Sequence, residues 1–255
     1  MYEEHPALLD GAVLWTRALR RAEPVRPVLP DGCMDLIWAD GSLLVAGPDT
    51  TAYVPGETAT RYAGIRFAPG DAPGILGVPA HELRDRRVAL AELWGGEARR
   101  LGERIAEAPD PAAALEDLAL RRAAGAPAPD PLLRAVVARL DAGRPVAETA
   151  DAVGLGARQL HRRSLEAFGY GPKTLARILR IQRALTLVRA GVPYAAAALR
   201  AGCADQAHLA RETRALAGMT LSAYTASLVV AGGAGAAGAS AKSETPLPSG
   251  SVTTA

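Results

Sequence analysis

Short apolar runs alternate with turn residues over the first 95 residues of the chain. Four runs of four or five residues lie at 25–29, 35–38, 43–46 and 63–67. Pro-Asp-Gly, Asp-Gly, Gly-Pro and Pro-Gly sequences bound them, and residues of these types favour turns between strands. The pattern predicts a small β-rich domain over residues 1–95, which we expect to act as a sensor.

The pattern changes to helix after residue 95. Residues 97–108 and 111–123 look helical, and Pro111 suits the first turn of a helix. We expect a helical connector over 96–124 and a stiff Pro/Ala-rich linker over 125–130. Residues 131–228 contain only helix and turn patterns, so the sequence as a whole predicts an α+β fold with an all-α second domain.

A motif occurs twice in this second domain. Each copy has a proline, an alanine five residues later, a glycine nine residues later and then a leucine. The two sets are Pro145, Ala150, Gly154 and Leu160, and Pro193, Ala198, Gly202 and Leu209. Two crossing helices need a small residue where they touch and a left-handed backbone in the turn. Two helix-turn-helix units are therefore predicted.

A long helix is predicted between the two units, over residues 172–189. Its apolar stripe consists of Leu175, Ile178, Leu179, Leu185 and Val188, and its basic positions are Lys173, Arg177 and Arg180. A helix of about 17 residues is roughly 25 Å long. It would separate the units by a distance near the DNA helical repeat of roughly 34 Å. The basic positions are either a solvated face or, as we favour, contacts to phosphates.

Charge divides the chain into an acidic and a basic half. Residues 1–129 carry 14 arginines against 19 acids, a net charge of −5. Residues 130–228 carry 13 arginines and one lysine against seven acids, a net charge of +7. A basic module of this kind is typical of a protein that binds nucleic acid.

The sequence has no pattern of a secreted or membrane-spanning protein. No apolar run approaches the roughly 20 residues of a membrane span, and the two cysteines form no disulfide framework. We expect a cytoplasmic protein. Residues 229–255 are rich in Gly, Ala and Ser and read as a disordered tail. The GxGxxG pattern at 233–238 follows no convincing strand, so no dinucleotide cofactor is expected.

The basic half resembles the DNA-binding domain of AraC/XylS-type regulators. The matching segments are Ala150-Asp-Ala-Val-Gly154, Phe168-Gly-Tyr-Gly-Pro-Lys-Thr-Leu-Ala-Arg177, Arg183-Ala-Leu, Gly202-Cys-Ala-Asp-Gln-Ala-His-Leu209 and Arg211-Glu. Residues 30–90 resemble the poorly characterised domain that often precedes this module in GC-rich bacteria. The segments there are Leu29-Pro-Asp-Gly-Cys-Met-Asp-Leu36, Gly64-Ile-Arg-Phe-Ala-Pro-Gly70, Gly77-Val-Pro-Ala and Leu83-Arg-Asp-Arg-Arg87.

The resemblance implies a sequence-specific regulator that binds double-stranded DNA. The second helix of each unit would read bases, through Arg158, His161 and Arg162 in the first and Gln206, Ala207, His208 and Arg211 in the second. Phosphate contacts are expected from Arg163, Lys173 and Arg177. An unknown small-molecule effector of the N-terminal domain, a homodimer and contact with RNA polymerase are further partners to consider.

The chain departs from the family pattern at four positions. An aromatic residue is usual at Ser164, Cys203 and Thr213, and a proline at Leu221. The smaller side chains at 164 and 213 are each expected to cost about 1–3 kcal/mol of packing where nothing compensates. This raises the alternative of a degenerate module that acts in protein interaction.

No catalytic or metal-binding pattern is evident, so no enzyme and no cofactor is expected. The four histidines are scattered, and no hydrolase elbow, phosphate loop or zinc spacing occurs. Asp31 lies in a Pro-Asp-Gly turn, which explains it better than a carboxylate pair with Asp35 does. One alternative stays open, a DNA-linked enzyme or thiol-based alkyl-transfer or sensor protein that uses Cys33.

Overall fold

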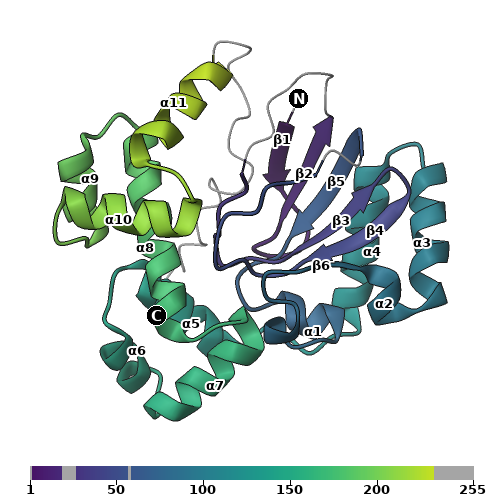
Figure 1. Ribbon diagram of the computed structural model, residues 1–255. Coiled ribbons are helices and arrows are strands. Elements are labelled where there is room, and N and C mark those ends of the chain that lie inside the picture. The colour runs from purple at the N-terminus through teal and green to yellow at the C-terminus, as the bar shows by residue number, and fades with distance from the viewer. Residues whose placement is uncertain (1, 19–26, 57–58, 233–255) are drawn as a thin grey trace, which may run out of the picture.

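The computed structural model describes residues 2–18, 27–56 and 59–232, and for 228–232 it describes the backbone only. Within these residues an antiparallel sheet has the strand order β1-β2-β5-β3-β4-β6 (Figure 1). The strands are β1 (Tyr2–Pro6), β2 (Val13–Ala18), β3 (Asp35–Ala39), β4 (Ser42–Ala46), β5 (Arg61–Arg66) and β6 (Arg87–Ala89). The runs at 35–38, 43–46 and 63–67 are β3, β4 and β5, and the α+β expectation is confirmed.

The strand expected at 25–29 is wrong for the part that the structure describes, which begins at residue 27. Only Val28 pairs, in an isolated bridge with Tyr53. Pro27 and Pro30 flank it, and a proline has no N–H to donate to a ladder. Three observed strands, β1, β2 and β6, have no counterpart among the predicted runs.

The other elements of the described chain are helices, of which the first two lie between β5 and β6 and the rest follow β6. They are α1 (Ala72–Leu76), a 3-10 turn η1 (Ala80–Glu82), α2 (Leu90–Trp94), α3 (Gly96–Glu107), α4 (Pro111–Ala124), α5 (Pro131–Asp141), α6 (Val146–Ala152), α7 (Ala157–Phe168), α8 (Pro172–Arg189), α9 (Tyr194–Ala201), α10 (Gln206–Ala217) and α11 (Leu221–Gly232). Asp110 and Asp130 accept backbone N–H groups at the starts of α4 and α5, each followed by a proline in the first turn.

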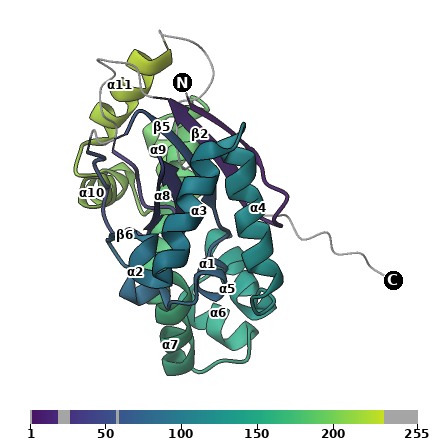
Figure 2. The same ribbon diagram turned by 90° about the vertical axis from the view of Figure 1, so that its right-hand side faces the viewer.

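The helices expected as a connector, α3 and α4, cover one face of the sheet (Figures 1 and 2). Leu101 and Leu115 are buried against sheet residues such as Leu36 and Ile65 in one apolar core. The physical reason is that both helices have an apolar stripe, and a stripe is stable only when it is buried. These helices therefore belong to the core of the N-terminal domain.

The second core surrounds α8. Its apolar side chains, among them Leu175, Ile178 and Leu185, pack with residues of α5, α7, α9 and α10. Figure 1 shows α6 and α7 near the start of α8 and α9 and α10 near its end. With 18 residues, α8 is about 27 Å long. It separates the two helix pairs as the sequence predicts.

The chain end differs from the expectation in one respect. Helix α11 continues to Gly232, beyond the start expected for the tail at 229. The GxGxxG pattern at 233–238 lies outside the described residues. No helix in the described part of the chain has the length and apolar character needed to cross a bilayer.

Candidate nucleic-acid interface

The first helix pair, α6 and α7, has the geometry that the motif requires. Ala150 is buried where the helices meet, and Leu160 packs beneath it with no exposed surface. Gly154 has a φ of +67°, a left-handed conformation that glycine adopts without steric cost. The N–H of Leu155 donates to the carbonyl of Ala150 at 2.9 Å and closes the end of α6.

The second helix pair, α9 and α10, repeats this arrangement. Ala198 and Leu209 are fully buried, and Gly202 has a φ of +85°. The N–H of Cys203 donates to the carbonyl of Ala198 at 2.8 Å, the counterpart of the bond that ends α6. Equal spacing from proline to glycine thus gives each pair a left-handed glycine and the same closing hydrogen bond, although α10 begins one residue later after its glycine than α7 does.

The positions that depart from the family pattern are interior positions. Ser164 and Thr213 have no exposed surface, and Cys203 and Leu221 are each 4% exposed. Neither hydroxyl, at 164 or 213, has a hydrogen-bond partner among the described residues. The expected loss of packing therefore concerns core positions, and its size stays a prediction.

All three proposed base-reading side chains of α7 are exposed, and two of them make no side-chain contact that is described within the protein. Arg158 and Arg162 lie on the exposed side, opposite the buried Leu160 and Phe168. His161 is also exposed but its ring lies on the α7–α8 turn, where a Cβ at Gly171 would meet the imidazole at 2.7 Å. The two arginines are thus the stronger candidates for base contact.

Helix α10 shows a similar division. Gln206, Ala207 and Arg211 are exposed. His208 is only partly exposed, and its Nδ1 accepts the N–H of Ala204 at 3.2 Å. The backbone N–H of His208 donates to Asp205 at 2.6 Å as part of the helix cap. His208 thus supports the start of α10, which the sequence pattern alone did not indicate.

Two of the three proposed phosphate ligands have acidic partners within the protein. Arg163 Nη1 lies 3.4 Å from an oxygen of Asp130. Arg177 Nε donates to Glu212 of α10 at 2.8 Å, so this arginine fastens α10 to α8. Lys173 is exposed at the start of α8. Of the three, Lys173 is the one that the fold leaves most available to a phosphate.

Arg183 on α8 is a structural residue to which the sequence analysis assigned no role. Its guanidinium donates to the carbonyls of Leu140 and Asp141 at the end of α5. It also donates to the carbonyl of Ala201 at the end of α9, at 3.0 Å. Partial burial lowers the pKa of Arg183, while the carboxylate of Asp141 acts in the opposite direction. Because free carbonyls at helix ends attract cations, this arginine joins the end of α5 to the end of α9.

The N-terminal domain contacts α5, α8 and the segment that follows α7. Arg134 of α5 donates to Asp10 at 2.6 Å and to Asp71 at 3.0 Å. Gln182 of α8 donates to the carbonyl of Pro30 at 2.5 Å. Burial raises the pKa of Tyr170, which follows α7 and is 3% exposed, well above its usual value. These contacts leave the outer side of α7 exposed.

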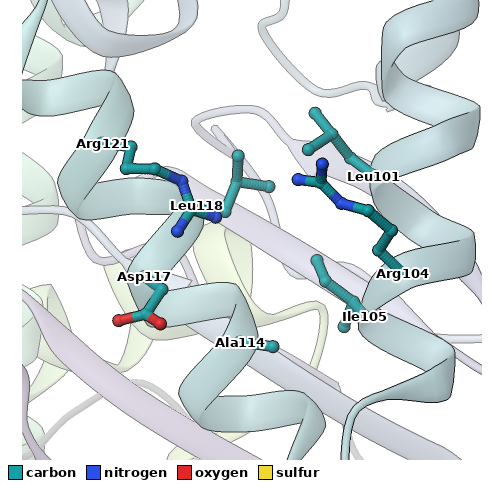
Figure 3. A pocket seen from close by; sticks show the side chains of 7 residues that line it. All are labelled: Leu101, Arg104, Ile105, Ala114, Asp117, Leu118 and Arg121. Carbon is teal, nitrogen blue, oxygen red and sulfur yellow. The ribbon is translucent and has the colours of Figure 1, made fainter.

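A groove of about 440 Å³ lies between α3 and α4. Figure 3 shows its floor of Leu101, Ile105 and Leu118, with Arg104 and Arg121 extending from the facing helices. It lies on the side of the sheet away from α7 and α10 (Figure 1).

The described residues contain no group of three His, Cys, Asp or Glu side chains that could hold a metal ion.

Two family models match the chain. One, a helix-turn-helix domain, matches residues 149–227 and so includes both recognition helices, α7 and α10. The chain carries an AraC/XylS-type helix-turn-helix domain. The other model is a domain of unknown function, DUF6597, and matches residues 12–89, in agreement with the second resemblance. No curated protein matches the sequence.

The solved structures to which this chain is similar include those of ToxT from Vibrio cholerae. The O395 protein is 10% identical with a TM-score of 0.45, over 83% of this chain and 96% of that one. The unsaturated fatty acid-bound wild-type protein of strain SCE256 is 12% identical with a TM-score of 0.44, over 88% and 96%. At these identities and TM-scores, the function of ToxT cannot be transferred to this chain. The helix-turn-helix domain at 149–227 supports a role in binding DNA and regulating transcription.

Proposed function

We propose that the chain is a sequence-specific regulator in which α7 and α10 read two neighbouring segments of the major groove. The observation that carries this proposal is the exposure of Arg158, Arg162, Gln206 and Arg211 on the two recognition helices. Arginine can donate two hydrogen bonds to one guanine, at O6 and N7. Glutamine can also form two bonds to one adenine, accepting from N6 and donating to N7. Ala207 offers a methyl contact, and His161 and His208 are secondary base contacts.

Backbone contacts complete the proposed interface. Lys173 is the leading phosphate ligand, and Arg163 and Arg177 take this role if DNA displaces their present acid partners, Asp130 and Glu212. The net charge of +7 over residues 130–228 supports attraction to DNA as a whole. Such contacts set the register of the protein on the duplex and carry no sequence information.

Control through the N-terminal domain is the second part of the proposal. The groove between α3 and α4 offers room for a small molecule. Its charged lining consists of Arg104, Arg121 and Asp117, and this excess of arginine favours a molecule with an anionic group. The contacts of Arg134 and Gln182 offer a path from this domain to the DNA-binding domain. A cytoplasmic location, a homodimer and contact with RNA polymerase belong to the same proposal.

A salt titration tests the proposal. Duplexes that the full chain selects from random-sequence DNA are compared with an unrelated duplex of equal length by fluorescence anisotropy. Because counterions are released, log K should fall by about 0.9 for each neutralised phosphate per log unit of salt. The selected duplex should bind at least about 1,000-fold more tightly than the unrelated one. Equal affinity for both duplexes would rule out sequence-specific binding.

A further inference from the structure

One segment of the N-terminal domain contacts the ends of both recognition helices. We call residues 48–53, which follow β4, the strap. A Cβ at Gly169, the residue that caps α7, would meet the ring of Pro48 at 2.5 Å. The N–H of Ala52 donates to the carbonyl of Leu216, in the last turn of α10, at 2.7 Å. The strap therefore lies between the C-terminal ends of α7 and α10.

The contact with α10 uses a group that the helix cannot satisfy by itself. The last four carbonyls of an α-helix have no partner within the helix, and the carbonyl of Leu216 is one of them. Ala52 supplies a donor from a distant part of the chain. This bond therefore constrains α10 where the helix has a free acceptor, without changing its exposed side.

The middle of the strap is fastened to the turn before β6 and to β6 itself. Arg87 donates to both oxygens of Asp49, each at 2.7 Å, and Asp49 is 6% exposed. The hydroxyl and N–H of Thr50 donate to Asp85 at 2.9 and 2.6 Å. Paired, charge-assisted bonds of this geometry hold a segment in one position.

The end of the strap is fastened as well. The guanidinium of Arg87 lies 3.9 Å from the centroid of the Tyr53 ring. Tyr53 exchanges two backbone hydrogen bonds with Val28, at 2.7 and 2.9 Å. Both sides of Ala52 are thus held by the N-terminal domain, and its N–H has a fixed place relative to the sheet.

From these contacts we infer that the strap is a positioning element that sets the distance and angle between α7 and α10, and so the half-site spacing that the protein accepts. Within the DNA-binding domain, α8 and the Arg177–Glu212 pair link the two helices. The strap adds a connection outside that domain. The inference rests on the proposed reading of DNA by both helices.

The spacing preference of the protein tests this inference. A selected duplex is compared with versions that have one base pair added or removed between the two contacted segments, and with a duplex that keeps one segment. One base pair shifts a segment by roughly 3.4 Å along the axis and rotates it by about 35°. The wild-type chain should lose about 10-fold or more in affinity for either altered spacing.

Two variants weaken the strap in different ways. Ala52→Pro removes the N–H that bonds Leu216, and Ala52→Gly is its control because it keeps that N–H. Arg87→Met removes the anchor of Asp49, and the neighbouring exposed Arg86→Met is its control. The circular dichroism spectrum of each variant is first compared with that of the wild type to check that the variant folds. If one variant does not fold, the spacing preference of the other tests the inference.

The expected result is a spacing preference that falls below about 3-fold in Ala52→Pro and Arg87→Met, with unchanged affinity for the single segment. The controls should keep the wild-type preference. If a folded Ala52→Pro or Arg87→Met chain discriminates among spacings as the wild type does, the strap has no positioning role. If the wild-type chain itself shows no spacing preference, the strap sets no spacing and the inference also fails. If the single-segment duplex binds as tightly as the full one, the proposed reading by two helices fails instead.

Discussion

Replacing Arg66 with methionine is expected to lower the free energy of unfolding of the N-terminal domain by about 3–5 kcal/mol. The side chain of Arg66 is 2% exposed, and its Nε lies 3.7 Å from both Asp31 and Asp35. Asp35 also accepts the indole N–H of Trp15 at 2.9 Å. Removal of the guanidinium takes a buried cation away from these carboxylates, which costs far more than an exposed ion pair contributes.

Tryptophan fluorescence measures this effect selectively. The three tryptophans, at 15, 38 and 94, all lie in the N-terminal domain, so a denaturant titration followed by their emission reports on that domain. Arg61→Met is the matched control, because Arg61 starts the same strand, is 68% exposed and lies 4.0 Å from Asp40. The control should change stability by less than about 1 kcal/mol. Equal, small losses in both variants would contradict the burial argument.

The second large effect concerns base recognition. Arg162→Ala and Arg211→Ala should each cost about 1–3 kcal/mol of binding to a selected duplex and relax the base preference at the contacted position. Both side chains are exposed, so stability should change little. Competition binding with a panel of single-base variants of the duplex measures affinity and preference together.

Arg144→Ala is the control for charge alone. Arg144 is exposed between α5 and α6, outside both recognition helices. Its loss should leave the order of preferred bases unchanged, whatever happens to the overall affinity. If Arg162→Ala and Arg211→Ala weaken all duplexes uniformly, as a lost phosphate contact would, the assignment of these residues to base reading is wrong.

The helical half of the fold could be predicted because its signals are local. The spacing of Ala150 and Gly154 reflects a helix crossing and a left-handed turn, both decided within a few residues. Strand β1 gave no such signal, because Glu3, Glu4 and His5 follow each other without apolar alternation. Its pairing with β2 depends on the partner strand rather than on its own pattern.

In the candidate site, too, the local features could be predicted from the sequence and the long-range contacts could not. The exposed side of each recognition helix follows from helical periodicity, and Arg162 and Arg211 are exposed as expected. The acidic partners of Arg163 and Arg177 could not be predicted from the sequence, because Asp130 and Glu212 lie more than thirty residues away in the chain. The bond between Ala52 and Leu216 joins the two domains and had no signature in either segment.

Methylation interference on a selected duplex tests the central claim, that two helices read two neighbouring segments of the major groove. Methylation of guanine N7 blocks the atom that arginine contacts in that groove. Two clusters of interfering guanines are expected, with centres about one helical turn, 10–10.5 base pairs, apart. A single cluster, or tight binding that N7 methylation leaves unchanged, would contradict the claim.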